Sequence, residues 1–564
     1  MTELTQSYYC GQTDEQLRYQ TIGECFDATV ARYPDHLALV ARHQNVRFTY
    51  AEYQREVNRL AGGLLEIGIT AGDRVGIWAT NCYEWCLTQF ATAKIGAIMV
   101  CVNPAYRTYE LEYALNKSGC KAIICGVQFK TSNYLQMLGE LAPELSGCAP
   151  GELSSAKLPM LTTVIRMGND HTPGMFNFSA VCEKGDGLSV KQLSEAGAKL
   201  NPDDAINIQF TSGTTGNPKG ATLSHCNILN NADTTGLRMK LTAEDRLCIP
   251  VPLYHCFGMV LGTLVCITQG AAAVFPAESF DPATTLDAVQ AERCTGLHGV
   301  PTMFIAELEH PDFDSYDLSS LRTGLMAGAP CPVEVMKQVQ SDMHMSEILI
   351  GYGQTECSPI NHMTVADDPF DKQVGTVGRP GPHLEVKIAG PDGQVVGVGE
   401  RGEICTRGYC VMAGYWDDDE RTQETIDAAH WLHSGDIGIM DAEGYVQVVV
   451  VGRIKDMIIR GGENIYPREI EEFLFTHPDI QDAAVFGVPD KRYGEQVAVW
   501  VQSREGAVLD AASVQGWCQD KIAHFKVPKY VKLVDEFPMT VTGKIQKFVM
   551  RDQMTEELGA SGQL

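Results

Sequence analysis

The sequence predicts an α/β fold: a large N-terminal domain of two doubly wound α/β subdomains plus a small β-barrel, followed by a small α+β C-terminal domain. Three observations lead to this prediction. Apolar strand-like runs alternate with amphipathic helical runs in the first third of the chain, and a second alternating run covers about residues 205–360. From about residue 381, short strands separated by glycine-containing turns follow. After residue 453, a compact α+β pattern continues to the end.

The first third of the chain gives the clearest alternation. Short apolar runs that predict strands lie at residues 37–40, 74–78, 98–102 and 122–125. Apolar side chains at helical spacing lie at residues 50–67, 83–95 and 107–117. Strands that alternate with helices in this way form parallel βαβ units, and several such units build a doubly wound sheet.

The composition is that of a folded globular chain. Of 564 residues, 44% are hydrophobic and 20% are charged, which excludes a disordered, collagenous or coiled-coil protein. The formal net charge of −27 repels phosphate backbones, so we expect no nucleic-acid partner. The 19 cysteines are scattered without a CxxC pair, which indicates reduced thiols. Because the first residues also lack the basic and apolar regions of a secretory signal, we expect a cytoplasmic protein.

Two stretches resemble features that we do not expect the protein to have. Residues 247–277 contain no Asp, Glu, Lys or Arg, as a membrane-spanning helix would. However, prolines, glycines and His255 interrupt the stretch and no basic flank borders it, so we predict a buried core and no transmembrane segment. Residues 397–402 match the GxGxxG fingerprint of dinucleotide-binding proteins. Because a strand-like run follows where the fingerprint needs a helix, we predict a hairpin turn there.

A loop rich in hydroxyl groups follows the strand-like residues 205–210. Its sequence is Thr211-Ser212-Gly213-Thr214-Thr215-Gly216-Asn217-Pro218-Lys219-Gly220. Hydroxyl groups, closely approachable backbone N–H groups and one ammonium group suit the oxygens of a polyphosphate. The spacing is not that of the Walker A loop. A plain surface loop would explain the composition, but neither the lysine nor the preceding strand.

Further motifs follow this loop in a fixed order. They are Tyr352-Gly353-Gln354-Thr355-Glu356, Ser434-Gly435-Asp436, Gly452-Arg453-Ile454-Lys455-Asp456, and the segment 538–547 that contains Lys544. Together with the hydroxyl-rich loop, they resemble the motifs of the adenylate-forming acyl-CoA synthetases, a superfamily that includes luciferases and the adenylation domains of peptide synthetases. The resemblance covers nearly the whole chain and is closest to the medium- and long-chain fatty acyl-CoA synthetases.

The resemblance implies a site for ATP and Mg²⁺. The residues that it implies for ATP or AMP are Thr211, Ser212, Gly213, Thr214, Thr215, Gly216, Lys219, Gly328, Ala329, Pro330, Gly351, Tyr352, Gly353, Gln354, Thr355, Asp436 and Arg453. In this scheme Tyr352 stacks on adenine, and Asp436 accepts the ribose hydroxyl groups. Thr215 and Glu356 are implied to hold Mg²⁺, a hard cation that prefers oxygen ligands.

Three residues are implied to be catalytic: Lys544, Glu356 and His255. Attack of a carboxylate on the α-phosphate of ATP gathers negative charge, which the ammonium group of Lys544 would stabilise in the transition state. His255 is the candidate for contacting the carboxylate or gating the thiol.

The resemblance also divides the chain. It implies an N-terminal AMP-binding domain at residues 1–453, a hinge at 454–456 that contains Lys455, and a mobile C-terminal domain at 457–564 that carries the catalytic lysine. Rotation of the small domain would let one site serve both half-reactions. After this rotation Arg460, Gly461 and Gly462 are implied to bind coenzyme A.

The acyl pocket is implied to be apolar. Its expected residues are His255, Met259, Val260, Val300, Met303, Met326 and Ala327. Methionine adapts to irregular shapes and suits a flexible alkyl chain. No acidic residue lies in 252–262, where amino-acid-activating relatives hold the substrate ammonium group, so an amino acid is disfavoured. We therefore expect a fatty acid–CoA ligase that forms acyl-AMP and pyrophosphate from the acid and ATP, then transfers the acyl group to coenzyme A and releases AMP.

Three alternatives remain at this stage. A fatty acyl-AMP ligase would deliver the adenylate to a carrier protein, although no obvious insertion restrains the small domain between residues 381 and 453. An aryl-acid CoA ligase would differ only in pocket shape. A nucleotide- or acyl-sensing module on an inactive fold is disfavoured by the intact motifs. The expected partners are small molecules (fatty acid, ATP and coenzyme A), while a homodimer and peripheral contact with a membrane stay open.

Overall fold

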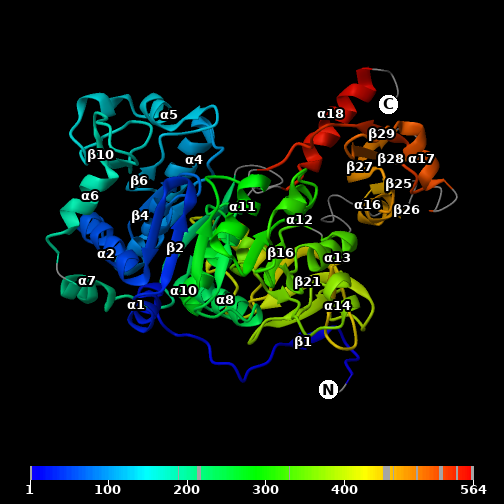
Figure 1. Cartoon of the computed structure of the whole chain (residues 1–564), viewed down its shortest axis with the longest axis horizontal. Coiled ribbons are helices and arrows are strands. Elements are labelled where there is room, and N and C mark those ends of the chain that lie inside the picture. The colour runs from blue at the N-terminus through cyan, green and yellow to red at the C-terminus, as the bar shows by residue number, and fades with distance from the viewer. Residues whose placement is uncertain are drawn as a thin grey trace.

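Two α/β lobes, a small antiparallel sheet and a C-terminal α+β unit make up the protein (Figure 1). The computed structural model describes residues 3–188, 190–211, 218–329, 331–448, 458–460, 463–465, 467–490, 493–519, 522, 525–540 and 544–560. In Figure 1 the first lobe is blue and cyan, the second is mainly green, and the C-terminal unit is orange and red.

The first lobe is built on an eight-stranded sheet. Its order is β10 (Met175–Asn177), β9 (Thr163–Arg166), β6 (Ala122–Cys125), β4 (Arg74–Trp78), β5 (Ile98–Cys101), β11 (Ala205–Thr211), β12 (Lys219–Ser224) and β22 (Gly414–Tyr415). Neighbours from β10 to β11 are parallel, and β12 and β22 add antiparallel pairs. The strands predicted at 74–78 and 122–125 match β4 and β6 at both ends, and β5 ends one residue before the prediction.

Local signals fix the ends of the helices in this lobe. Helix α2 (Tyr50–Glu66) begins after Thr49, whose hydroxyl accepts the Glu52 amide while the Glu52 carboxylate accepts the Thr49 amide. Helix α3 (Tyr83–Ile95) ends at Gly96, which has a φ of +72°. These helices and α4 (Thr108–Ser118) confirm the three predicted helices. The other elements are α1 (Ile22–Arg32), α5 (Tyr134–Leu141), α6 (Phe178–Gly185), α7 (Val190–Gly197), the 3₁₀ turn η2 (Pro143–Gly147), β7 (Gln128–Phe129) and β8 (Ser132–Asn133).

The second lobe is built on a nine-stranded sheet. Its order is β19 (Arg379–Pro380), β18 (His362–Met363), β17 (Glu347–Tyr352), β16 (Thr323–Ala327), β15 (Gly296–Gly299), β13 (Arg246–Cys248), β14 (Ala272–Phe275), β2 (Leu37–Ala41) and β3 (Val46–Thr49). Strand β2 confirms the strand predicted at 37–40, but it pairs with β14. An early segment of the chain therefore belongs to the second sheet, a pairing that local sequence does not reveal.

Helices and short turns complete the second lobe. They are α8 (His225–Arg238), α11 (Pro282–Glu292), α12 (Pro301–Leu308), α13 (Val333–Asp342), α14 (Phe370–Gly375), and the 3₁₀ turns η1 (Arg42–Gln44), η4 (Phe313–Ser315) and η5 (Thr355–Cys357). Helix α15 (Asp419–Thr425) follows β22 of the first sheet.

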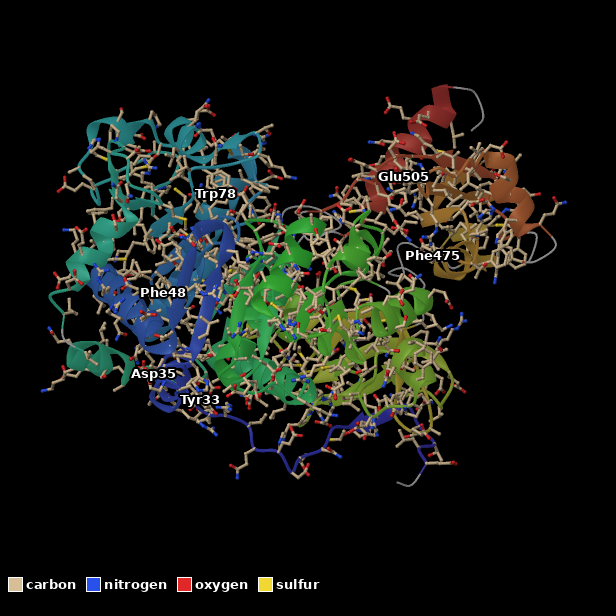
Figure 2. The ribbon with its side chains drawn as sticks, in the orientation of Figure 1. Tyr33, Asp35, Phe48, Trp78, Phe475 and Glu505 are labelled. Atoms are coloured by element: carbon tan, nitrogen blue, oxygen red, sulfur yellow. The ribbon has the colours of Figure 1, made fainter. Side chains whose placement is uncertain are left out.

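One cluster of buried apolar side chains joins the two lobes. It contains Phe26 of α1, Trp85 of α3 and Leu229 of α8, together with Ile77 of the first sheet and Leu325 of the second. Trp78, which Figure 2 labels, belongs to a second cluster on the opposite face of the first sheet. Because both sheets contribute to the shared core, the loops at their ends are held in fixed relative positions.

The uncharged stretch at 247–277 lies in this core, as predicted. It forms the end of β13, a short helix α9 (Cys256–Gly258), a π-helical segment η3 (Met259–Leu264), α10 (Val265–Gln269) and β14. All six residues of the π-helical segment are buried. Among the described residues, no helix combines the length and the apolar character needed to cross a membrane.

The third unit is a five-stranded antiparallel sheet where the sequence indicated a small β-barrel. Its order is β1 (Tyr8–Cys10), β20 (Glu385–Ala389), β21 (Arg401–Arg407), β23 (Leu432–Met440) and β24 (Val446–Val448). The N-terminal segment supplies β1 at one edge of this sheet, and β24 forms the other edge (Figure 1). Because no pairing among the described strands joins these two edges, the sheet is open. The GxGxxG match at 397–402 leads into β21, which confirms the predicted hairpin turn.

The C-terminal unit has its own sheet and two apolar clusters. The strands are β25 (Ile458–Arg460), β26 (Glu463–Ile465), β27 (Ile480–Asp490), β28 (Gly494–Ser503) and β29 (Tyr530–Leu533), and the helices are α16 (Pro467–Leu474), α17 (Ala511–Cys518) and α18 (Lys547–Ala560). One cluster lies around Val499 and the other around Trp500, on opposite faces of β28. Figure 2 labels Phe475 and Glu505 in this unit. The boundaries 1–453, 454–456 and 457–564 stay predictions, and the hinge with Lys455 lies outside the described residues.

Candidate active site

The predicted site residues gather at one edge of the second sheet. Strands β13, β15, β16 and β17 are neighbours and run parallel, so their carboxyl ends meet at this edge. The chain leaves β15 at Val300 and β16 at Gly328, and β17 ends at Tyr352. Ligands of open α/β sheets bind outside the carboxyl ends of the strands. Sequence motifs that lie far apart in the chain therefore line a single region.

The hydroxyl-rich loop connects β11 and β12. Thr211 and Lys219 face each other across this hairpin, and the Thr211 hydroxyl donates to the Lys219 carbonyl oxygen at 3.4 Å. The remaining loop residues of the prediction, Ser212, Gly213, Thr214, Thr215 and Gly216, lie outside the described residues. The hairpin thus places Lys219 at the mouth of the predicted phosphate loop.

A tyrosine connects Lys219 to Glu356. The ammonium group of Lys219 lies 3.2 Å from the Tyr415 hydroxyl and 4.5 Å from the centre of its ring. The Tyr415 hydroxyl donates to Glu356 Oε1 at 2.6 Å, and Glu356 is buried. Burial, followed by the charge of Glu356, raises the pKa of Tyr415 far above its ordinary value, so the tyrosine stays a hydrogen-bond donor.

Tyr415 lies outside all of the predicted sequence motifs. It lies in β22, which pairs with β12 so that Tyr415 stands opposite Ala221. The pairing that brings it beside Glu356 is between distant segments, and no local motif marks it. Only knowledge of this strand pairing could have found it.

Tyr352 and Asp436 are in direct contact. The Tyr352 hydroxyl donates to Asp436 Oδ2 at 2.8 Å, which ties β17 of the second sheet to β23 of the small sheet. Burial, then the Asp436 carboxylate, raises the pKa of Tyr352 well above its usual value. The predicted adenine and ribose residues are therefore adjacent. Arg453, predicted for the ribose, lies outside the described residues.

The glycines on either side of Tyr352 have no room for a side chain. A Cβ atom at Gly353 would lie 2.1 Å from the Pro359 carbonyl oxygen, and one at Gly351 would lie 2.6 Å from Ile360 Cδ1. Thr355 and Glu356 follow in the turn η5. This packing fixes the direction in which the turn presents Glu356.

The lysine of the C-terminal motif reaches the same edge. A Cβ atom at Gly328 would lie 3.6 Å from Lys544 Cε and 3.3 Å from Val300 Cγ1, and Gly328 has a φ of +86°. Thr540 fixes the turn that presents Lys544, because its amide donates to the Lys544 carbonyl oxygen at 2.8 Å and its hydroxyl accepts the Lys544 amide at 3.0 Å. Ala329 is exposed next to Gly328, and the predicted Pro330 lies outside the described residues.

His255 is neutral and oriented. Its Nδ1 accepts the Phe257 amide at 3.1 Å, which leaves the proton on Nε2. Burial, reinforced by the Lys544 charge, lowers the pKa of His255 to about 3. At neutral pH the ring therefore offers a polar N–H group without a positive charge beside the lysine.

Five of the predicted wall residues share one apolar cluster. They are Met259, Val260, Val300, Met303 and Ala327. Met326 packs into a different cluster, because successive side chains of β16 point to opposite faces of the sheet. The structure therefore separates Met326 from the other five.

Of the residues predicted for coenzyme A, the structure describes Arg460, which contacts other residues of the C-terminal unit. The Arg460 guanidinium donates to Gln496 Oε1 at 2.7 Å and lies 4.4 Å from the centre of the Tyr493 ring, both within the C-terminal unit. Gly461 and Gly462 lie outside the described residues. An ion pair of 2.8 Å between Arg504 and Glu309 of the second lobe joins the C-terminal unit to the body of the protein.

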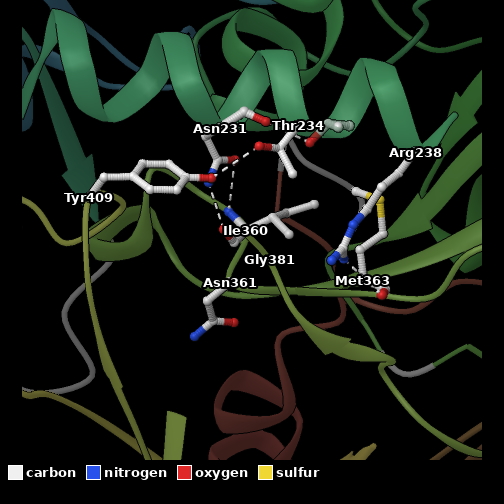
Figure 3. A pocket seen from close by; sticks show the side chains of 9 residues that line it. Asn231, Thr234, Arg238, Ile360, Asn361, Met363, Gly381 and Tyr409 are labelled. Carbon is white, nitrogen blue, oxygen red and sulfur yellow. Dashed lines mark hydrogen bonds between the residues drawn. The ribbon is translucent and has the colours of Figure 1, made fainter. Parts of the chain in front are cut away.

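Two enclosed cavities are too small for substrates. The one in Figure 3, of about 10 Å³, lies between α8 and the segment after η5 and is lined by Asn231, Thr234, Arg238, Asn361 and Tyr409 among others. Hydrogen bonds join Asn231 to Ile360 and Thr234 to Tyr409 in its wall (dashed lines in Figure 3). A second, of about 30 Å³, borders Leu253 and Tyr254. Each has room for water alone.

Comparisons with known proteins agree with this geometry. The model of the AMP-binding enzyme family matches residues 26–416, and that of the AMP-binding enzyme C-terminal domain matches residues 469–544. The hydroxyl-rich loop and Lys544 both fall within these matches.

Relatives and solved structures match along the whole chain. The putative acyl-CoA synthetase YngI of Bacillus subtilis (strain 168) is 48% identical over 547 residues, which covers 97% of this chain and 99% of that protein. The mitochondrial medium-chain acyl-CoA ligase ACSF2 of Danio rerio is 46% identical over 559 residues and covers 99% of this chain and 92% of that protein. The anthranilate CoA ligase AuaEII in complex with anthranoyl-AMP gives a TM-score of 0.84 at 25% identity, over 97% of this chain and 99% of that one. The chain therefore belongs to the AMP-binding enzymes, the adenylate-forming acyl-CoA synthetases.

Proposed function

We propose that the protein is a fatty acid–CoA ligase that acts on medium-chain acids. As an ATP-dependent acyl-CoA synthetase, it joins an acid to coenzyme A through an acyl-AMP intermediate. The medium-chain preference is supported by the printed name of the Danio rerio relative and by the apolar, methionine-containing wall. The single observation that carries the proposal is the convergence of Lys544, Gly328 and His255 at the carboxyl edge of the second sheet.

The triphosphate is proposed to bind between the hairpin of Thr211 and Lys219 and the carboxylate of Glu356. The buried carboxylate of Glu356 is an oxygen ligand of the kind that Mg²⁺ prefers, and Thr215, outside the described residues, is proposed as the second ligand. The chemistry that Mg²⁺ supplies when bound is neutralisation of the phosphate oxygens. Tyr415 keeps the Lys219 ammonium group and the Glu356 carboxylate at a fixed separation, so that both are oriented before ATP arrives.

In the proposed first step, a carboxylate oxygen of the acid attacks the α-phosphorus of ATP. The new bond joins this oxygen to phosphorus, and the bond to pyrophosphate breaks. Lys544 would stabilise the negative charge that gathers on the attacking and phosphoryl oxygens. Neutral His255 would donate from Nε2 without adding a second full charge beside the ammonium group.

In the proposed second step, the thiol sulfur of coenzyme A attacks the acyl carbon and AMP leaves. Arg460, Gly461 and Gly462 are proposed to line the path of coenzyme A, which requires an arrangement other than the one described, because Arg460 contacts Gln496 and Tyr493. The rotation of the 457–564 domain about the 454–456 hinge, where Lys455 lies, is part of this proposal.

The acyl tail is proposed to contact the apolar cluster formed by Met259, Val260, Val300, Met303 and Ala327. Met259 and Val260 belong to the π-helical segment, and such segments are frequent at functional sites. Met326 drops out of the proposed pocket because of its position on the opposite face of β16.

The test is CoA-dependent AMP formation with straight-chain acids from acetate to stearate, with benzoate as the aryl probe. We expect the highest kcat/KM with medium-chain acids. Best activity with benzoate would assign an aryl-acid ligase, and adenylation without thioester formation on coenzyme A would assign an acyl-AMP ligase. Absence of ATP–pyrophosphate exchange with every acid would reject the enzyme and favour a sensing module.

The proposed location is the cytoplasm. All 19 cysteines are free in the structure, and most are buried, which suits a reducing compartment. The printed name of one relative is mitochondrial, so fractionation of cells that express the untagged protein decides between the two locations.

A further inference from the structure

A cysteine, a histidine and a carboxylate meet on the small sheet outside the proposed catalytic residues. Strands β21 and β23 are antiparallel, and Cys405 stands opposite His433. The register shifts between Glu403 and Cys405, because β23 accommodates extra residues around Gly435, which has a φ of +74°. This irregularity brings side chains of both strands to one point.

The potential ligand atoms converge closely. His433 Nδ1 lies 2.8 Å from Glu403 Oε2 and 3.6 Å from Cys405 Sγ, and one ligand atom from each residue lies within 4.8 Å of the other two. Zinc–sulfur bonds of about 2.3 Å and zinc–nitrogen bonds of about 2.0 Å at a tetrahedral angle place sulfur and nitrogen about 3.5 Å apart. The separation between Cys405 and His433 is therefore that of two ligands on one ion.

A carboxylate lies on the far side of the imidazole ring. Asp427 Oδ2 lies 3.6 Å from His433 Nε2. Asp427 is itself held by the amides of Ala429 and Trp431, which donate to its Oδ1 at 2.8 and 2.9 Å. In metal-binding histidines the second nitrogen commonly faces a carboxylate. Metal binding would replace the 2.8 Å hydrogen bond between His433 Nδ1 and Glu403 Oε2, and the Nε2 proton would then face Asp427.

We propose that Cys405, His433 and Glu403 form a binding site for a divalent transition metal of the zinc class. Cys405 Sγ, His433 Nδ1 and Glu403 Oε2 are the three protein ligands, and water completes the coordination. Cys405 is fully buried while Glu403 and His433 are half-exposed, so the ion enters from solvent and meets the sulfur last. The soft sulfur ligand separates this site from the all-oxygen Mg²⁺ site proposed at Glu356.

Binding changes the state of the thiol. When the metal–sulfur bond forms, the S–H bond breaks and the proton leaves to solvent, because a coordinated thiol is deprotonated.

The metal site shares a contact with the ribose segment. The Gly435 amide donates to Glu403 Oε1 at 2.9 Å, and Gly435 precedes Asp436, which accepts from Tyr352. A metal bound to Glu403 would therefore contact, through Gly435, the same short segment of β23 that holds the proposed ribose ligand Asp436. Linkage requires that any effect of the metal on ATP affinity is matched by an equal effect of ATP on metal affinity.

Cobalt spectroscopy of the untagged, full-length protein tests the site. The protein is freed of metal by a chelator and titrated with Co²⁺ in excess Mg²⁺, which occupies oxygen sites. We expect one equivalent of Co²⁺ and a thiolate-to-cobalt absorption band. Cys405→Ala should abolish the band, and Glu403→Gln should weaken Co²⁺ binding by about tenfold or more. Cys148→Ala, which removes a half-buried thiol elsewhere, should leave both unchanged.

Two results would overturn the proposal. One is a wild-type protein without the absorption band, which would mean that His433 only bridges Glu403 and Asp427. The other is a band that persists in Cys405→Ala, which would assign the metal to another cysteine. The Glu403 side chain is half-exposed, so Glu403→Gln leaves the core unchanged. If Cys405→Ala does not fold, the Co²⁺ affinity of Glu403→Gln still tests the proposal.

Discussion

The side chain of Lys544 passes directly over the backbone of Gly328. A Cβ atom at Gly328 would lie 3.6 Å from Lys544 Cε, although the two residues belong to the C-terminal unit and to the second lobe. The glycine thus leaves the space through which the lysine enters the edge of the sheet. The ion pair between Arg504 and Glu309 supports the same arrangement of the two parts.

Replacing Lys544 with alanine should suppress adenylation by about 10²-fold or more, because it removes a cation from the charge that develops in the transition state. The measurement is ATP–pyrophosphate exchange beside thioester formation from supplied acyl-AMP, which should change little. Lys532→Ala, which removes a lysine paired with Glu557 elsewhere in the C-terminal unit, is the control and should retain both rates. Equal loss of both steps in Lys544→Ala would contradict the assigned role.

Replacing Gly328 with alanine should slow adenylation by about tenfold. The new Cβ atom fills the space beside Lys544 and Val300, and the φ of +86° adds about 1–2 kcal/mol of strain. Gly393→Ala separates the two effects, because Gly393 has a φ of +77° and no neighbour within 4 Å of the new atom. Both variants should unfold at lower temperature, and only Gly328→Ala should lose adenylation. Equal activity of the two variants would show that the space is not needed.

Replacing Tyr415 with phenylalanine should raise the KM for Mg·ATP by about tenfold or more. A hydrogen bond to a charged group contributes about 1.5–3 kcal/mol, and the change leaves Glu356 Oε1 without its donor. The matched control is Tyr445→Phe, which removes a 2.6 Å hydrogen bond to Asp368. Steady-state kinetics over a range of ATP and Mg²⁺ concentrations measures the effect. If both variants bind Mg·ATP equally well, Tyr415 does not position the site.

Replacing Arg504 with alanine should slow adenylation by at most a few fold, without slowing thioester formation from supplied acyl-AMP. The ion pair with Glu309 is partly exposed, and such pairs contribute about 0–1 kcal/mol. An ion pair of this strength favours the described arrangement of the C-terminal unit and the second lobe, but it is too weak to hold that arrangement alone. Arg293→Ala removes an exposed ion pair with Asp317 inside the second lobe and should change neither step. A larger loss in thioester formation than in adenylation would mean that the ion pair of Arg504 and Glu309 stabilises the arrangement used for thioester formation.

Acid should destabilise the protein in part through His298. Burial lowers the pKa of this fully buried ring to about 4, below its value of about 6.5 in an unfolded chain. The neutral ring therefore contributes stability above pH 6.5, which is lost as the pH falls towards 4, by about 3 kcal/mol at most. In His298→Gln the apparent unfolding temperature should fall less over this range than in the wild type. His171→Gln, at an exposed position, should match the wild type; identical curves for all three proteins would exclude a contribution from His298.

Local sequence was sufficient for the elements and motifs, and insufficient where distant segments meet. The strands β4 and β6 follow from short apolar runs, and the strand β11 was expected before the hydroxyl-rich loop. Tyr415 carries no local signal, because its place beside Glu356 depends on the pairing of β22 with β12, and the alternation along β16 turns Met326 away from Ala327. The contact between Lys544 and Gly328 was not predicted, since nothing in the sequence near either residue encodes it.

Strand β2 has a consequence for how the chain reaches its native state during synthesis. Its partner β14 ends at Phe275, so β2 has no neighbour on that side until the ribosome has made more than two hundred further residues. The second sheet therefore cannot form around β2 while the first lobe emerges, and contacts between such distant segments form slowly. Until then, the apolar residues of β2 are exposed to chaperones and to other nascent chains, which makes this short strand a vulnerable point in biogenesis.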